Sequence, residues 1–118
     1  MYAFYGSLRV GMPLYDQFKN ELNYQFSAWI QGHRLYSLGE FPCAVKSDVA
    51  SEKIVVEFFE ITDHVTKKEI DSIEIGYGYY RDHIEVDGVQ ALIYLFKDAA
   101  NYQQVLSGDW VRFYRTRR

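Results

Sequence analysis

The chain opens with the segment Tyr2-Ala3-Phe4-Tyr5-Gly6-Ser7-Leu8-Arg9, and the interpretation of the fold starts there. Aromatic residues interleaved with a small one predict a short strand over residues 2–5. Gly6 and Ser7 then turn the chain. A strand that ends in Gly-Ser exposes consecutive backbone N–H groups, which can hold a carboxylate or a polarised carbonyl oxygen. The alternative is an ordinary turn before the first helix.

Outward from this segment, strand patterns outnumber helical ones. Further strands are expected over residues 24–30, resuming at 35–36, over 53–61, and over 79–86 and 89–96, where Asp87-Gly88 is a strong hairpin signal. Helices are expected over residues 13–22, from a cap at Asp63 to about residue 73, and over residues 99–105, with a break over 38–42. This order predicts an α+β fold with a small mixed or antiparallel, barrel-like sheet surrounded by helices.

Composition narrows the class of protein. The 118 residues suffice for one domain with its own core. A net charge of −3 and a pI of about 5.5 argue against a nucleic-acid partner, whose binding proteins are basic. We expect no secretion signal and no membrane span, and Cys43, the single cysteine, cannot form an internal disulfide. These features predict a cytoplasmic protein.

Basic residues crowd the end of the sequence: Arg112, Arg115, Arg117 and Arg118. We interpret residues 112–118 as a solvated, frayed basic tail that follows a single domain of residues 1–111. A contact with a phosphate or an acidic partner is the alternative.

Several familiar chemistries lack a sequence signature here. The three histidines have no metal-ligand spacing, and Cys43 has no nucleophile motif around it. The Gly76-Tyr77-Gly78 segment lacks the rest of a phosphate-binding motif. We therefore expect no metal site, no cysteine nucleophile and no dinucleotide- or phosphate-binding motif.

Glu74 is a candidate for proton transfer. It follows the apolar residues of the second expected helix and precedes a glycine- and tyrosine-rich segment. In a partly dry pocket, its pKa would rise and suit it to move protons near neutral pH. Taken alone, a solvated glutamate is the commoner alternative.

Five segments in one order resemble the gamma-glutamylcyclotransferase family. They are Tyr5-Gly6-Ser7-Leu8-Arg9, the stretch from Gly32 to Cys43, Ile70-Asp71-Ser72-Ile73-Glu74, the stretch from Tyr79 to Val86, and Gly108-Asp109-Trp110. The resemblance spans almost the whole chain. It implies a barrel-like sheet with packed helices, on which the opening turn and the glutamate meet in one pocket.

The resemblance also implies a reaction, in which a gamma-glutamyl group cyclises to 5-oxoproline and releases an amine or amino acid. Glu74 would be the general acid and base. The substrate would contact Tyr5, Gly6, Ser7 and Leu8, and either Tyr79 or Tyr80, of which the alignment favours Tyr79. No metal or cofactor would be needed, and the oligomeric state, monomer or homodimer, stays open.

One departure from the family pattern concerns the pocket wall. The family's Glu-Gly-Tyr-Pro is replaced by Glu74-Ile75-Gly76-Tyr77, and the loop to Tyr79 is short. The altered loop leaves open a non-catalytic binder of gamma-glutamyl or related acidic metabolites. Two further alternatives are a member acting on a gamma-glutamylamine, with the same pocket but another leaving group, and an aromatic-faced binder of single-stranded nucleic acid that uses the arginine tail.

Overall fold

The fold contains two β-sheets and three helices. The structure is a computed structural model that describes residues 1–116. The larger sheet has five strands in the spatial order β2 (Asn23–Gln31), β5 (Lys53–Glu60), β1 (Tyr2–Phe4), β7 (Val89–Leu95) and β6 (Tyr80–Val86). Strands β1 and β7 run parallel and the other pairs run antiparallel, so the sheet is mixed.

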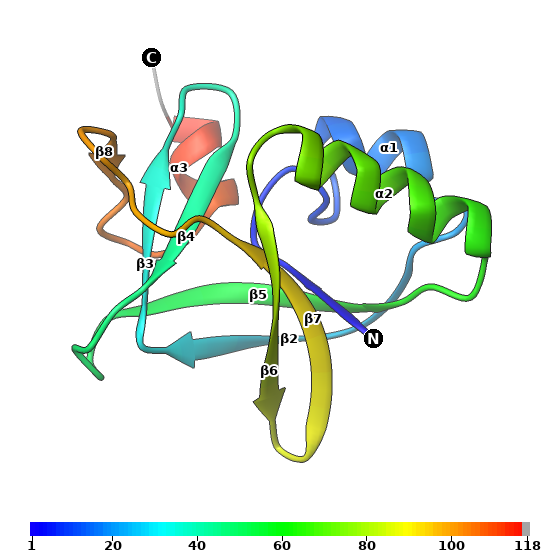
Figure 1. Cartoon of the computed structure of the whole chain (residues 1–118), viewed down its shortest axis with the longest axis horizontal. Helices are drawn as coiled ribbons and strands as arrows, with labels where there is room; N and C mark the ends of the chain where they lie inside the picture. Colours follow the sequence, from blue (N-terminus) through cyan, green and yellow to red (C-terminus); the bar gives the residue numbers. More distant parts are fainter. Residues whose placement is uncertain (117–118) are drawn as a thin grey trace.

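The smaller sheet consists of β4 (Pro42–Lys46), β3 (His33–Ser37) and β8 (Gln103–Gln104). The expected α+β class and mixed sheet are confirmed. The sheet is barrel-like only in a loose sense, because the larger sheet stays open, with β2 and β6 as its edges. The hairpin of β6 and β7 turns at the predicted Asp87-Gly88 and projects from the body (Figure 1).

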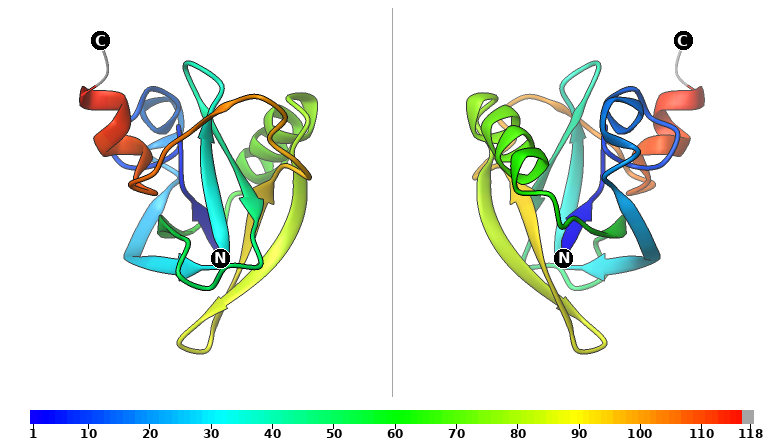
Figure 2. Two further views of the ribbon diagram at one scale, coloured as in Figure 1. Left: turned by 90° about the vertical axis from the view of Figure 1, so that its left-hand side faces the viewer. Right: turned by 90° about the vertical axis from the view of Figure 1, so that its right-hand side faces the viewer.

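The helices are α1 (Pro13–Phe18), α2 (His64–Gly76) and α3 (Trp110–Thr116). Pro13 begins α1, where its missing N–H has no intrahelical partner to lose. Asp63 caps α2, accepting a hydrogen bond from the Thr66 backbone N–H at 2.9 Å. Figure 2 shows α1 and α3 on one side of the β3–β4 hairpin and α2 on its other side.

Two of the helix predictions need correction. The helix expected over residues 13–22 ends at Phe18. Residues 19–21 form a turn into β2, in which the Glu21 amide donates to the Phe18 carbonyl at 2.8 Å. The helix expected over residues 99–105 is absent. Ala100 has a φ of +46°, which a right-handed helix cannot contain, and residues 103–104 pair with β3 instead.

The segment expected to fray is helical as far as Thr116. Trp110 is fully buried, and the rings of Phe113 and Tyr114 lie 5.4 Å and 5.8 Å from its own. Trp110 is a member of the main core cluster, and Phe113 and Tyr114 pack against that cluster, so these residues anchor α3 to the core. Arg117 and Arg118 lie outside the described residues, and the division of the chain at residue 111 stays a prediction.

Candidate active site

A cavity of about 530 Å³ opens among the helices and the end of β1. Its wall combines the β1 end and the turn after it, α1, the loop before β4, the end of α2, and single residues of β7 and α3. The lining residues are Ala3, Phe4, Tyr5, Gly6, Ser7, Leu8, Pro13, Leu14, Gln17, Glu40, Phe41, Pro42, Ile73, Glu74, Tyr77, Tyr79, Tyr94 and Tyr114. The opening turn and Glu74 therefore share one cavity.

The turn at residues 6–8 presents backbone donors there. No described residue accepts a hydrogen bond from the amides of Gly6, Ser7 or Leu8. Gly6 is required here for packing: a Cβ would lie 2.6 Å from Pro42 Cγ. The Pro42 ring occupies the space that a side chain at position 6 would take, so the turn and the start of β4 pack closely here.

The next residue of the turn has a different environment. The buried Arg9 places its Nε 2.8 Å from Glu57 Oε2 and its Nη1 2.8 Å from Asp109 Oδ1. The Val10 amide donates to the other oxygen of Glu57 at 2.8 Å. These bonds fix the far end of the turn, so Arg9 holds the loop whose residues 6–8 line the cavity.

Glu74 lies in the last turn of α2, within the helix that we expected to end at about residue 73. Its side chain is half-buried and lines the cavity, and no described residue forms a hydrogen bond or ion pair with its carboxylate. Burial raises the pKa of this carboxyl from 4.5 to about 7. The group is therefore poised to exchange a proton near neutral pH.

Asp71, one helical turn earlier, ties α2 to the sheet. Its Oδ1 accepts a hydrogen bond from the hydroxyl of the buried Tyr94 at 2.9 Å, and Arg81 Nε lies 3.5 Å from the same oxygen. Residues three apart lie on one side of a helix. The Asp71–Tyr94 bond thus helps to hold Glu74 over the cavity.

The structure separates the two candidate tyrosines. Tyr79 lines the cavity, and its hydroxyl donates to the Pro42 carbonyl. Burial, the nearby Glu74 and Cys43 raise its pKa, so the phenol stays protonated. Tyr80 does not line the cavity and packs against the core cluster around Trp110. Successive residues of a strand face opposite sides, which explains the split.

Tyr5 joins the two sheets beneath the cavity. Its hydroxyl donates to the Tyr94 carbonyl of β7 at 2.6 Å and accepts from the Ala44 amide of β4 at 3.0 Å. Burial, Tyr79 and Glu74 raise the pKa of this phenol well above its ordinary value. The only proton of the hydroxyl is already donated, so Tyr5 offers its ring to the cavity.

Five aromatic residues of the wall were missed in the sequence: Phe4, Phe41, Tyr77, Tyr94 and Tyr114. Phe41 directly precedes Pro42 in the second resembling segment, and Tyr77 stands between two glycines, so both had a usable signal. Tyr114 had none, because its place depends on how Trp110 seats α3 on the core. The departure after Glu74 has a simple form: α2 continues through Gly76, and Tyr77 caps it.

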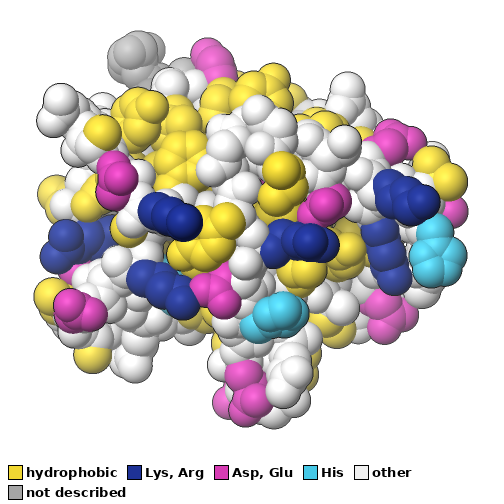
Figure 3. All heavy atoms as spheres, viewed as in Figure 1, with side chains coloured by type: hydrophobic (Ala, Val, Ile, Leu, Met, Phe, Trp, Pro, Cys, Tyr) yellow, Lys and Arg dark blue, Asp and Glu magenta, His cyan; other side chains and the backbone are white. Residues whose placement is uncertain are grey.

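Two observations concern the described part of the chain alone. Among residues 1–116, no three His, Cys, Asp or Glu side chains gather as a metal ion would require. None of the three helices in that range is long and apolar enough to cross a membrane. On the face shown in Figure 3, side chains of both charges are interspersed.

The site and fold define a class of protein. The model of the gamma-glutamyl cyclotransferase, AIG2-like family matches residues 2–112, and the chain belongs to this family. A relative from Pyrococcus horikoshii, named "Putative gamma-glutamylcyclotransferase PH0828", is 32% identical over 108 residues, which are 92% of this chain and 88% of the relative.

Solved structures agree with this assignment. The crystal structure of the Pyrococcus protein superposes with a TM-score of 0.80 at 31% identity, over 97% of this chain and 93% of that one. The solution structure of ytfP from Escherichia coli gives 0.70 at 27% identity, over 93% and 95%. An allophanate hydrolase of Kluyveromyces lactis gives 0.75 at 15% identity, over 98% of this chain but 21% of that one, and shares the fold alone.

Proposed function

We propose that this protein is an enzyme that cyclises a gamma-glutamyl group to 5-oxoproline and releases an amine or amino acid. One observation carries the proposal: the Glu74 carboxyl, with a pKa raised to about 7, lines the same cavity as the unused amides of Gly6, Ser7 and Leu8. A proton-transfer group and a set of oxyanion donors are what this reaction needs.

The reaction is intramolecular. The substrate's α-amine loses a proton to the Glu74 carboxylate and attacks the side-chain carbonyl carbon, which forms the ring C–N bond and a tetrahedral oxyanion. The bond to the leaving nitrogen then breaks as Glu74 returns the proton to it. Well-oriented intramolecular reactions reach effective molarities of about 10⁵ M or more, so positioning the substrate supplies much of the rate.

The chain's own groups cover each task. The amides of residues 6–8 bind the substrate's carboxylate or the oxyanion, two roles that the same donors fit equally well. The hydroxyls of Tyr5 and Tyr79 already donate to backbone carbonyls, so these residues contact the glutamyl end of the substrate with their rings. No step draws on a metal or a cofactor. Tyr80 has no part in this arrangement.

The charge of the cavity lining determines which charge on the leaving group is favoured. Its described lining includes two carboxylates, Glu40 and Glu74, and no Lys, Arg or His. Among the described lining residues, a leaving group that carries a carboxylate would meet no cationic side chain. We therefore expect a gamma-glutamyl derivative of a neutral or cationic amine to be preferred over one of an amino acid.

A non-catalytic binder of gamma-glutamyl or related acidic metabolites is the alternative on the same fold. It is less favoured, because a binder gains nothing from a carboxyl held near neutral pKa beside its anionic ligand. The cytoplasmic location and a monomeric or homodimeric state stay predictions.

The test is a panel of gamma-glutamyl compounds incubated with the purified protein, with released 5-oxoproline as the readout. The panel contains glutathione, a gamma-glutamyl dipeptide, a gamma-glutamylamine and gamma-glutamyl-lysine. Turnover of any member supports the proposal and identifies the leaving group. Thermal stabilisation by these compounds without release of 5-oxoproline would contradict it and favour the binder.

A further inference from the structure

Two aromatic rings meet at the outer edge of the cavity. The rings of Phe41 and Tyr77 lie 5.3 Å apart at an interplanar angle of 61°, an edge-to-face contact. Phe41 comes from the loop before β4, and Tyr77 caps the C-terminus of α2. Both line the cavity, yet Tyr77 is 62% exposed and Phe41 half-buried, which places the pair at the opening.

The exposure of the lining residues increases from the floor of the cavity to this opening. The floor includes residues that are themselves buried, among them Phe4, Tyr5, Leu8, Pro42, Tyr79 and Tyr94. Glu74 is half-buried, and Tyr77 follows it at the helix end, where the Tyr77 amide donates to the Glu74 carbonyl at 3.1 Å. The pair at the opening thus adjoins the proton-transfer group.

The position of Glu74 fixes where the leaving group must lie. Glu74 returns its proton to the leaving nitrogen, so that nitrogen has to approach the Glu74 carboxyl while the glutamyl end occupies the floor beside residues 6–8. Whatever is attached to the nitrogen then extends toward the opening. At about 30 Å³ for each water, a volume of about 530 Å³ equals roughly 18 water molecules, which leaves room for a substituent beyond the glutamyl end.

We infer that Phe41 and Tyr77 form the subsite for the leaving group and select gamma-glutamyl amides of apolar or aromatic amines. This inference rests on the proposed function and names the substrate class for that site. An apolar substituent would remove the exposed parts of both rings from water, and an aromatic one would add a third ring to an edge-to-face pair. A small substituent would reach neither ring.

The position of the pair is built into the chain. Tyr77 stands directly before Gly78, whose φ of +100° lets the backbone leave the helix, and the Tyr77 amide bonds to the Ile73 and Glu74 carbonyls. Gly39, with a φ of +108°, turns the loop that carries Phe41. Two separate backbone turns therefore bring the rings together. Neither Phe41 nor Tyr77 is a buried core residue, so truncating either ring leaves no cavity in the core.

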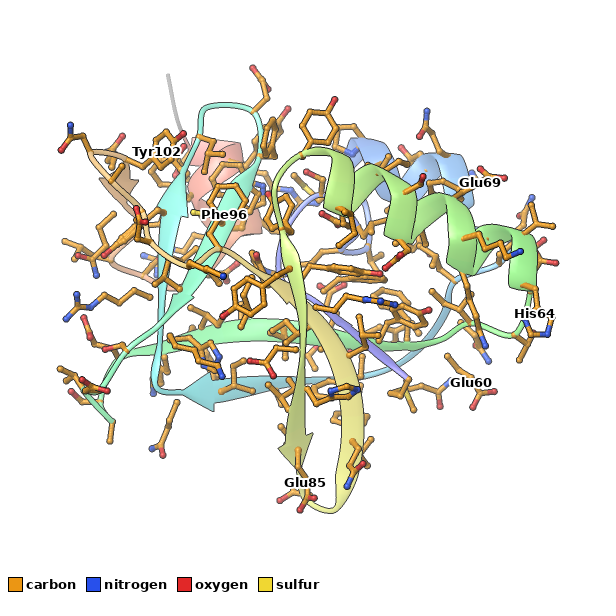
Figure 4. All side chains as sticks on the ribbon, viewed as in Figure 1. Glu60, His64, Glu69, Glu85, Phe96 and Tyr102 are labelled. Atoms are coloured by element: carbon orange, nitrogen blue, oxygen red, sulfur yellow. The ribbon has the colours of Figure 1, made fainter. Side chains whose placement is uncertain are left out.

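The test compares two substrates that share the glutamyl end, gamma-glutamylphenethylamide and gamma-glutamylmethylamide. For wild type, Phe41→Ala, Tyr77→Ala and the double variant, kcat/KM is measured with both, and the ratio between the substrates is the readout. The matched control is Tyr102→Ala, because Tyr102 is similarly exposed but lies near β8, away from the cavity (Figure 4). Circular dichroism confirms that each variant is folded.

We expect wild type to prefer the phenethylamide. Each single variant should lower the ratio about three- to tenfold, which corresponds to the worth of one aromatic contact, mainly through KM, and Tyr102→Ala should leave it unchanged. Equal losses on both substrates, or a wild type that prefers the methylamide, would overturn the inference while the cyclisation stands. No 5-oxoproline from either amide, with turnover of another member of the gamma-glutamyl panel, would overturn this inference alone. No 5-oxoproline from the amides or from any panel member would overturn the proposed function as well.

Discussion

Arg9 and Asp109 stand one hundred positions apart in the sequence and lie in direct contact, with 2.8 Å between Arg9 Nη1 and Asp109 Oδ1. Glu57 of β5 completes the cluster through Arg9 Nε. Asp109 also caps α3, accepting from the Arg112 amide at 3.2 Å. This cluster links Arg9 of the opening turn to Asp109 directly before α3. The first and the last of the five resembling segments are therefore in direct contact.

The first prediction concerns the buried arginine. Arg9→Ala should lower the free energy of unfolding by about 3 to 5 kcal/mol, because removing one partner leaves the buried Glu57 charge uncompensated. Urea unfolding measures the change. Arg34→Ala is the control, since the Arg34–Glu52 pair is more exposed and should contribute far less. Similar losses in the two variants would contradict the structural role given to Arg9.

The second prediction concerns Gly108. A Cβ at this position would lie 2.2 Å from the Lys53 carbonyl oxygen, and its φ of +70° is unfavourable for other residues. Gly108→Ala should therefore lower stability by at least about 2 kcal/mol. Gly39→Ala has a positive φ but open space around the added methyl, so it measures the backbone contribution alone. Gly108→Ala should lose more stability than Gly39→Ala. Equal losses would contradict the close approach of Gly108 to the Lys53 carbonyl of β5.

The third prediction concerns pH and Glu74. The folded protein holds this carboxyl at a pKa of about 7, above its ordinary 4.5, so the folded state binds more protons than the unfolded state between these values. Stability contributed by Glu74 therefore falls as pH rises from about 4.5 to 7. Glu74→Gln should match wild type near pH 4.5 and exceed its stability by roughly 1 to 3 kcal/mol at pH 8.

Thermal and urea unfolding at the two pH values check this prediction, and groups common to both proteins cancel in the difference. A difference between wild type and Glu74→Gln that does not change with pH would show that the carboxyl is not held in a desolvated site.

The fourth prediction concerns the charge of the leaving group. At equal concentration, a gamma-glutamylamine should be cyclised with a kcat/KM at least about tenfold above that of the gamma-glutamyl dipeptide of similar size, because no cationic side chain among the described lining residues meets a carboxylate. Raising the salt concentration should narrow the gap by screening the repulsion. Equal rates at low salt would refute this interpretation of the cavity.

Much of the architecture followed from local patterns. Alternation and the Asp-Gly pair predicted most strands and the β6–β7 hairpin, and Asp63 predicted the start of α2. Residues 99–105 and the helix at the chain end were missed, because their conformations depend on pairing with β3 and on packing around Trp110, which a local pattern does not contain.

The candidate site divides in the same way. Glu74 and the amide turn were recognisable by resemblance, and the structure brings both to one cavity. The role of Arg9 was not, because its partners are distant in sequence. The choice between Tyr79 and Tyr80 depended on strand register, which a two-residue aromatic run leaves open.

The central claim is that the Glu74 carboxyl moves the proton that cyclisation requires. The most direct test is 5-oxoproline release from the best gamma-glutamyl substrate by wild type and Glu74→Gln under identical conditions near pH 7.5. Glutamine has nearly the same shape but cannot accept the proton, so we predict a loss of at least about 100-fold in kcat. A Glu74→Gln protein that releases 5-oxoproline at the wild-type rate would contradict the account.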